Sequence, residues 1–315
     1  MADVMLIGEP MGMFIANEYG ELSEGEKFTK EVAGAEVNVG IGLSRLGYNV
    51  NFLTKLGTDP LGRYIFNTLK KEELKTDFIT FDNEHNTGIM LKNKIDKGDP
   101  QTVYYRKDSA FSTFSIDDVI GKIDFKEIRL LHVTGIPLAL NKDTRAAIYY
   151  LMAKAKEAGT FIIFDPNLRP SLWKDEKTMI NVMNDVAKFA NVIMPGISEG
   201  KILTGSNDKE TIADFYINLG CECVIIKSGE EGAFIKSKGK EVIMVSGFKV
   251  ENVVDTVGAG DGFAVGVISG YLDGLDWKES TIRANAIGSI QVQHQSDNKN
   301  LPTRSYLESY IKQNA

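Results

Sequence analysis

The segment Val253–Leu272, VVDTVGAGDGFAVGVISGYL, brings together residues suited to phosphoryl transfer. Gly258 and Gly260 let backbone N–H groups approach a ligand closely, and the apolar residues that follow predict a helix whose first turn favours negative charge. Asp261 adds a carboxylate that can accept a proton. Phosphorylation of an alcohol requires such a base beside an anion cradle. On this segment alone, a glycine-rich turn with Asp261 as a helix cap is an equal alternative.

Two further segments carry side chains that fit an anionic ligand. In TVYYRKDSA, strand alternation places Tyr104 and Arg106 on one face, and the guanidinium fork of Arg106 can hold a carboxylate. In FDPNLRPSLW, Arg169 follows an expected strand into a loop. The alternatives remain open, since Arg106 can be an exposed surface arginine and Arg169 can pair with a surface acid. The sequence contains neither the dinucleotide fingerprint nor a Walker loop.

Two motifs in order carry a resemblance to a known family. DTVGAGDGFAVGVISG resembles the C-terminal signature of the ribokinase-like (PfkB) carbohydrate kinases, D-T-x-G-A-G-D, and AGAEVNVGIGLSRLG resembles their N-terminal signature. The resemblance covers nearly the whole chain and implies ATP as phosphoryl donor. It makes Asp261 the catalytic base and Gly258, Ala259 and Gly260 the anion hole. Asp255 then lies near a position that binds a monovalent cation in some members, and the need for that cation is left open.

The resemblance also implies the substrate side. Gly34, Ala35 and Asn38 match the sugar-contacting loop, although Asn38 can instead make a helix-start hydrogen bond. Phe164–Trp173 resembles the segment of 2-keto-3-deoxygluconate kinases and some fructokinases in which the arginine faces the substrate and the transferring phosphoryl group. Together with Tyr104, two arginines exceed the needs of a neutral sugar. We therefore expect a sugar acid, 2-keto-3-deoxygluconate, phosphorylated on its terminal hydroxyl.

Two departures bear on this expectation. Met13 stands where many neutral-sugar kinases of the family carry an aspartate, and the loss of that charge suits an anionic substrate. Met90 stands where a tyrosine is common in some acid-sugar kinases, which weakens the assignment of the ligand. The alternatives are a fructokinase or another neutral-sugar kinase, and a non-catalytic ligand sensor on the same fold.

On the nucleotide side, the resemblance assigns roles to several residues. Glu199 in MPGISEG matches the N-x-x-E motif that organises Mg²⁺ through water, but Gly196 replaces its asparagine. The alternative for Glu199 is an acid at a helix N-terminus, where the helix dipole favours negative charge. The nucleotide-binding residues that the resemblance implies, besides Gly258 and Gly260, are Lys227, Ser228 and Gly229 in KSGEEGAF and Asn285 in ANAIGSI.

Short apolar runs alternate with amphipathic segments, which predicts a mainly parallel sheet covered by helices on both faces. The expected strands are Val4–Gly8, Val50–Lys55, Phe78–Phe81, Leu130–Thr134, Phe161–Asp165, Val192–Met194 and Val224–Lys227. The expected helices are Val37–Leu46, Leu61–Lys71, Lys142–Ala158, Lys177–Phe189, Lys209–Leu219, Gly260–Leu272 and Thr281–Gln293.

Residues 11–32 and 87–106 do not follow the alternation of strands and helices. Their sequence predicts extended segments, with a turn at 96–100. We expect them to form a small β-sheet lid on a single ribokinase-like three-layer α/β domain spanning 1–315, and ordinary surface hairpins are the alternative. Because a small sheet exposes its edges, we also expect a homodimer or a higher oligomer joined through the lids.

Composition excludes some partners. The formal net charge of −7 disfavours nucleic acid and anionic membranes, which usually bind a basic face. No run approaches the roughly 20 apolar residues of a membrane span, and the N-terminus lacks the pattern of a signal peptide. Cys221 and Cys223 are expected as reduced thiols on one face of a strand. These features indicate a cytoplasmic protein.

Overall fold

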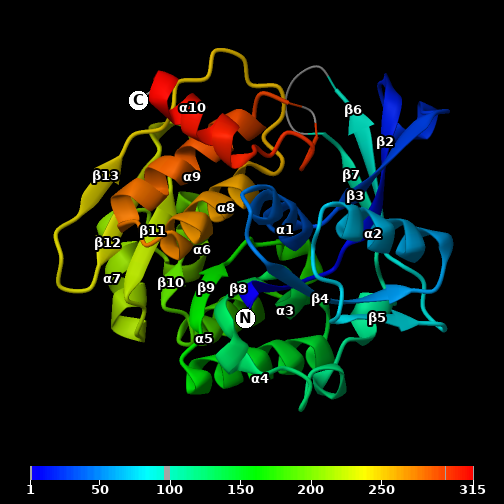
Figure 1. Ribbon diagram of the computed structural model, residues 1–315, viewed down its shortest axis with the longest axis horizontal. Helices are drawn as coiled ribbons and strands as arrows, with labels where there is room; N and C mark the ends of the chain where they lie inside the picture. The colour runs from blue at the N-terminus through cyan, green and yellow to red at the C-terminus, as the bar shows by residue number, and fades with distance from the viewer. Residues whose placement is uncertain (1, 96–99, 295, 315) are drawn as a thin grey trace.

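The computed structural model describes residues 2–95, 100–294 and 296–314. Within them, nine strands form one sheet in the order β13-β12-β11-β10-β9-β8-β1-β4-β5, and all neighbouring strands pair in parallel except β12, which is antiparallel to both β11 and β13 (Figure 1). Their bounds are β1 Ala2–Ile7, β4 Val50–Gly57, β5 Ile79–Asp82, β8 Ile128–Thr134, β9 Phe161–Asp165, β10 Val192–Ile193, β11 Cys223–Lys227, β12 Ala233–Ser237 and β13 Ile243–Val245.

Both faces of this sheet are buried, as the nearly continuous apolar strands require. Along β1, Val4 and Leu6 belong to one core cluster, whereas Met5 and Ile7 belong to the other. The period of two along a strand therefore divides each central strand between two cores. The result is the predicted three-layer arrangement of helices, sheet and helices.

Each core is closed by its own set of helices. The first core contains side chains from α1 Ala35–Arg45, α2 Pro60–Lys71, α8 Ala259–Leu272, α9 Trp277–Gln291 and α10 Arg304–Asn314. The second contains side chains from α3 Ile136–Leu140, α4 Lys142–Ala158, α5 Glu176–Ala187, α6 Ile197–Thr204 and α7 Lys209–Leu219. In Figure 1, α4 and α5 appear in green on the side of the sheet opposite α8 and α9.

Local signals set the helix ends. Asp59 caps α2, its side chain accepting hydrogen bonds from the N–H groups of Leu61 and Gly62. Asn141 caps α4 in the same way, and Gly159 ends that helix in the left-handed conformation that glycine adopts without strain. Such caps explain why the predicted bounds of Lys142–Ala158 and Lys209–Leu219 are confirmed to the residue.

A separate small sheet follows the order β3-β2-β6-β7 and contains β2 Met11–Tyr19, β3 Phe28–Ala33, β6 Ile89–Lys94 and β7 Thr102–Tyr105. The two segments that break the helix–strand alternation pair through β2 and β6, which run parallel. A minor apolar cluster that includes Met13 and Met90 lies on this sheet. Most of the turn predicted at 96–100 lies outside the described residues.

Some elements and the placement of the cysteines differ from the predictions. The predictions omitted helices α3, α6 and α10 and strands β12 and β13, because each is short or follows a mixed polar pattern. Cys221 lies before β11, so the prediction that both cysteines share a strand face is wrong: Cys221 packs in one core and Cys223 in the other. Both thiols are free and buried, as expected.

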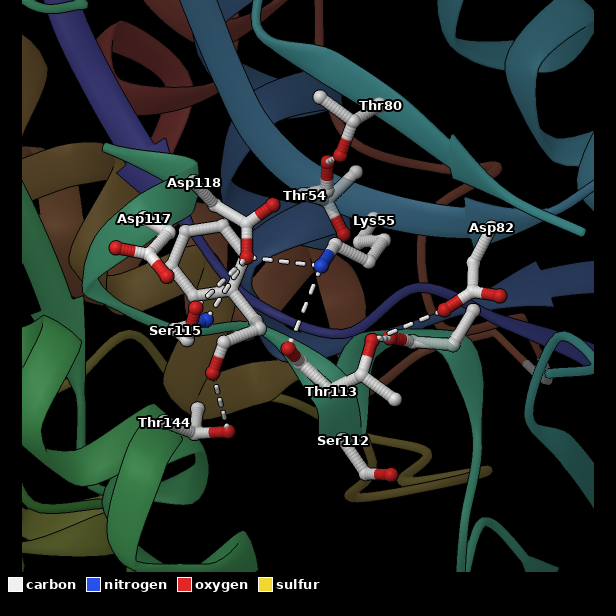
Figure 2. A network of polar contacts seen from close by, with 12 residues as sticks. Thr54, Lys55, Thr80, Asp82, Ser112, Thr113, Ser115, Asp117, Asp118 and Thr144 are labelled. Atoms are coloured by element: carbon white, nitrogen blue, oxygen red, sulfur yellow. Dashed lines mark hydrogen bonds and ion pairs between the residues drawn. The ribbon is translucent and has the colours of Figure 1, made fainter. Parts of the chain in front are cut away.

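The connection between β7 and β8 is tied to the large sheet by a polar network around Lys55 (Figure 2). The Lys55 Nζ donates to Asp118 at 2.8 Å and to the carbonyl of Thr113 at 3.3 Å. Thr113 donates in turn to Asp82 at the end of β5. None of the described helices is both long and apolar enough to cross a membrane.

Candidate active site

The predicted site residues converge where the parallel strands end, which is where open α/β sheets bind ligands. Two cavities lie there, of about 390 Å³ and about 860 Å³. Lys227, Thr256 and Gly260 line both. The cavities therefore meet at the first turn of α8, where a group can pass between a ligand in one and a ligand in the other.

The smaller cavity holds the residues predicted for the substrate. Its lining includes Gly34, Ala35, Asn38, Tyr104, Arg106, Arg169, Glu199, Gly258 and Asp261. The sequence places these residues in five separate segments, and the fold brings them to one cavity. Their roles toward a ligand remain predictions.

Asp261 lies in the first turn of α8 and faces two amides. Asn38 Nδ2 donates to Asp261 Oδ2 at 2.7 Å, and Asn167 Nδ2 lies 3.5 Å from Oδ1. Burial raises the pKa of Asp261 to about 7, an effect that the Asn38 hydrogen bond only partly offsets and that nearby Asp165 increases. A carboxylate with a pKa near neutrality is well matched to accept a hydroxyl proton.

Asn38 is held by residues near the other end of the chain. Its Oδ1 accepts a hydrogen bond of 2.9 Å from Asn298, whose amide also donates to the Val32 carbonyl. With oxygen and nitrogen both engaged, the amide of Asn38 is oriented with its nitrogen toward Asp261. The helix-start alternative considered for Asn38 is thus not how its side chain is used.

The anion cradle has the expected local structure. Gly258 precedes α8 with a φ of 80°, a left-handed conformation that favours glycine, and a Cβ there would lie 2.7 Å from the Asp297 carbonyl. Helix α8 begins at Ala259, so the N–H groups of its first turn lack intrahelical partners. The glycines thus allow close packing as well as close approach of a ligand.

Arg106 is not a free cation, because it pairs with the buried Glu9. Arg106 Nε donates to Glu9 Oε2 at 2.8 Å and Nη2 lies 2.5 Å from the same oxygen, while Ser109 also donates to Glu9. The guanidinium lies 5.9 Å from the ring centre of Tyr104, consistent with the predicted shared face. The sequence did not mark Glu9, which places a buried negative charge beside Arg106.

Arg169 lies on a strained loop after β9. Its Nη1 donates to the Leu168 carbonyl at 3.0 Å, and none of the described acids forms an ion pair with it. Asn167 has a φ of 39°, unusual for a residue other than glycine. This conformation accompanies the approach of the Asn167 side chain to Asp261. Strained backbone of this kind concentrates at functional sites.

Glu36 is a further residue that the sequence did not mark. It is buried in the first turn of α1, where Thr134 donates to it. Burial raises the pKa of Glu36 to about 7, and Arg106 and Arg169 are among the groups that lower it. Its charge contributes to the raised pKa of Asp261, so the two carboxyls are coupled.

The larger cavity is lined partly by residues predicted for the nucleotide. Gly229, Ala259, Gly260 and Asn285 line it with apolar side chains such as Phe263, whereas Ser228 is not part of its lining. The Asn285 amide donates to the carbonyls of Val245 and Ser246.

Lys227 is engaged by Asp165, with both carboxylate oxygens 2.8 Å from Nζ. Burial opposes the charge of Lys227, but Asp165 and Glu199 outweigh it and raise the pKa. The ammonium thus stays charged at the junction of the two cavities.

Glu199 has both oxygens engaged by backbone N–H groups. Oε1 accepts from Leu168 and Oε2 from Gly196, each at 2.7 Å. This matches the helix N-terminal role that is the alternative to metal binding. Across the described residues there is also no group of three or more His, Cys, Asp or Glu side chains that could hold a metal.

Comparison with known proteins decides the family. The family model described as "pfkB family carbohydrate kinase" matches residues 1–304. The chain belongs to this family. It is 48% identical over 310 residues to the 2-dehydro-3-deoxygluconokinase of Bacillus subtilis (strain 168), covering 98% of this chain and 95% of the relative.

Solved structures of sugar kinases have the same fold. The PfkB protein from Polaromonas sp. JS666 superposes with a TM-score of 0.90 at 39% identity, covering 98% of this chain and 100% of that one. A sugar kinase from Pyrococcus horikoshii, solved in complex with ATP, superposes with a TM-score of 0.82 at 27% identity, covering 98% and 99%. The ribokinase-like fold and the carbohydrate kinase activity expected from the sequence are confirmed.

Proposed function

We propose that this PfkB kinase transfers the γ-phosphoryl group of ATP to the terminal hydroxyl of 2-keto-3-deoxygluconate, also called 2-dehydro-3-deoxygluconate. The observation that carries the proposal is that Arg106 and Arg169 line the same cavity as the carboxyl of Asp261. Two arginines together with the Asp261 carboxyl as a base fit a substrate that has a carboxylate at one end and an alcohol at the other. The similarity to the Bacillus subtilis enzyme supports the same substrate.

In this proposal, Asp261 accepts the proton of the hydroxyl. Asn38 and Asn167 hold the carboxylate in place, and its pKa of about 7 leaves a large fraction ionised at neutral pH. The backbone N–H groups of Gly258, Ala259 and Gly260 stabilise negative charge as it develops on the phosphoryl oxygens. Arg169, which is not paired with any of the described acids, adds positive charge at the same place.

The sugar is held by residues of two segments. Some N–H donors of the Arg106 guanidinium do not face Glu9, and these bind the substrate carboxylate together with Tyr104. Glu9 fixes the orientation of the guanidinium. Gly34, Ala35 and Asn38 contact the hydroxyl groups from the start of α1.

The larger cavity accommodates the nucleotide. Its apolar side chains, such as Phe263 and Val292, suit a nucleotide base, and Gly229 and Asn285 also line it. Lys227, which lines both cavities, would lie near the phosphates. Mg²⁺ supplies positive charge to the phosphate oxygens in such reactions. Glu199 would contact it through water, since both of its oxygens already accept backbone hydrogen bonds.

The small sheet serves as a lid on one domain that spans residues 1–315. Tyr104 and Met90 of this sheet line the substrate cavity, so its closure would exclude water and limit hydrolysis of ATP. Its edge strands β3 and β7 expose backbone and side chains, among them Tyr105, which is 62% exposed. We expect the edges to be covered in a homodimer, which sedimentation at micromolar concentration would detect. The buried free thiols fit a reducing compartment such as the cytoplasm.

A coupled assay of ADP release over a panel of sugars tests the substrate. We expect the highest kcat/KM for 2-keto-3-deoxygluconate, with fructose and the neutral analogue that lacks the carboxylate far below it. Faster turnover of fructose would refute the sugar-acid proposal and leave the family assignment intact. No turnover of any sugar in the presence of ATP and Mg²⁺ would favour a ligand sensor.

A further inference from the structure

A buried lysine joins the small sheet to the loop before α8. Lys92 of β6 places its Nζ 2.7 Å from Asp255 Oδ2 and 3.0 Å from Asp297 Oδ1, and its side chain is only 3% exposed. The three charged residues lie far apart in the sequence. Lys92 belongs to β6, Asp255 lies in the loop before α8, and Asp297 lies in the segment before α10. Neither aspartate is exposed, so one ammonium is shared by two buried carboxylates.

This ammonium is held charged by its surroundings. Burial disfavours the charge of Lys92, but Asp297 and Asp255 outweigh it and raise the pKa. Removing the ammonium would leave two carboxylates facing each other without compensation, which is strongly unfavourable in a buried site. The geometry thus requires a single positive charge at this point.

The same charge supports the anion cradle. Asp255 uses Oδ2 for Lys92 and Oδ1 to accept from the N–H of Val257, which fixes the loop just before Gly258. The Asp297 carbonyl packs against Gly258 on the other side. The cation therefore holds together the two loops that enclose the residue preceding the cradle.

A second path leads to the base. Asn298, next to Asp297, donates to Asn38, and Asn38 donates to Asp261. A shift of the loop around Asp297 would thus change the position of the amide that holds the catalytic carboxylate. Errors of about 1 Å in such positions can cost roughly a hundredfold in rate.

We propose that the Lys92 side chain is a built-in monovalent cation, so that this enzyme needs no dissociable K⁺ or NH₄⁺ to order the loop before α8. An ammonium group on a tether presents the same charge as free NH₄⁺ and pays less entropy on binding. Because Lys92 belongs to β6, the charge is in place only when the small sheet is seated on the large domain. The inference rests on the proposed role of Gly258–Gly260 as the phosphoryl cradle.

The test compares wild type with Lys92→Ala in chloride salts of K⁺, NH₄⁺ and tetramethylammonium at constant ionic strength. Wild type is expected to turn over equally in all three. Lys92→Ala is expected to lose kcat roughly ten- to hundredfold in tetramethylammonium, and K⁺ or NH₄⁺ should restore most of it. Lys55→Ala is the matched control, since Lys55 pairs with Asp118 at 2.8 Å away from both cavities. It should keep its kinetics and show no response to the cation.

Several outcomes would overturn the inference. Activation of wild type by K⁺ or NH₄⁺ would show that a dissociable cation is used. A folded Lys92→Ala protein that keeps full activity, or that loses activity without recovery in any salt, would make Lys92 only a latch for the small sheet. If Lys92→Ala does not fold, Lys92→Met replaces it, and the salt response of wild type decides independently.

A measurement without substrate separates this inference from the proposed function. The melting temperature of Lys92→Ala should rise in K⁺ or NH₄⁺ relative to tetramethylammonium, while that of wild type should not. Absence of this rise refutes the built-in cation even if the enzyme phosphorylates sugar acids. A clear rise supports it even if the sugar panel refutes the substrate.

Discussion

Two polar clusters of this kinase show opposite electrostatic character. In the base cluster, defined by Asp261, Asn38 and Asn167, burial raises the pKa of the carboxyl to about 7. In the Lys55 cluster, defined by Lys55, Asp82, Thr113 and Asp118 (Figure 2), burial also acts on Asp82. There, however, hydrogen bonds from the N–H groups of Glu84 and His85 outweigh burial and lower the pKa to about 2.

The two carboxyls therefore contribute to the stability of the folded protein in opposite ways. Ionised Asp82 is more stable in the folded protein than in the unfolded chain, so it contributes to folding. Ionised Asp261 is less stable in the folded protein, so its charge opposes folding and remains available for a proton. Groups held in such unfavourable states concentrate at functional sites. Four experiments test this difference between the two clusters.

The largest effect is expected for Asp261→Asn. Loss of the base should lower kcat by about 10²- to 10⁴-fold, while the sugar and ATP still bind. Stability above pH 7 should rise, because the folded state no longer contains a carboxylate whose ionisation it disfavours. Steady-state kinetics, calorimetric binding and thermal unfolding measure the three quantities. A variant that keeps turnover within a few-fold of wild type would remove Asp261 as the base.

Arg106→Ala should raise KM for the sugar acid by about ten- to a hundredfold, the value of a charge-assisted hydrogen bond. The neutral analogue should be affected much less, because it has no carboxylate to bind. Glu9→Gln is the matched variant, since it keeps the guanidinium and loosens its direction. Its effect on KM should be smaller. Equal effects of Arg106→Ala on the acid and the neutral sugar would contradict the carboxylate role.

The pH dependence of kcat/KM should report Asp261. With a pKa raised to about 7, the base is protonated and activity is lost as the pH falls through 7, with a plateau above it. Glu36→Gln removes a neighbouring charge that contributes to this raised pKa, so the acid limb should move to lower pH by a fraction of a unit. A profile that is flat from about pH 6 to about pH 8 would be inconsistent with this base.

The smallest effect on activity is expected for Asp82→Asn. Kinetics should stay at the wild-type values, while the free energy of unfolding at neutral pH should fall by about 2 kcal/mol. Because the folded pKa of Asp82 lies below its ordinary value, its contribution is present above pH 4 and is lost as the pH falls towards 2. Urea unfolding at neutral pH and near pH 3 measures the difference. An equal loss at both values would attribute the effect to packing instead.

Much of the fold could be predicted because periodicity and caps are local. The bounds of Lys142–Ala158 follow from its apolar spacing, the Asn141 cap and Gly159. Helix α6 could not be predicted, since its eight residues are too few for a clear period. The two cysteines were placed on one face because the run from Cys221 to Lys227 was interpreted as a strand, whereas β11 begins at Cys223.

The candidate site was predicted where a motif carried it. Gly258, Gly260 and Asp261 could be predicted because their spacing forms a recognisable motif. The structure places them in one cavity with Asn38, Arg106 and Arg169. Glu9, Glu36 and Lys92 were missed because each is an ordinary charged residue beside apolar neighbours in the sequence. Nothing local tells that they are buried or which charge they face.

The glycine-rich motif, the position of Asp261 after it and the three-layer order of strands and helices follow from the sequence alone, because each depends on neighbouring residues or on short periods. How these groups are charged and held depends on the tertiary structure. Glu9 pairs with Arg106 across 97 residues, and Lys92 meets Asp255 and Asp297 across 163 and 205. Electrostatic energies depend on distance and burial in space, and neither can be read from spacing along the chain.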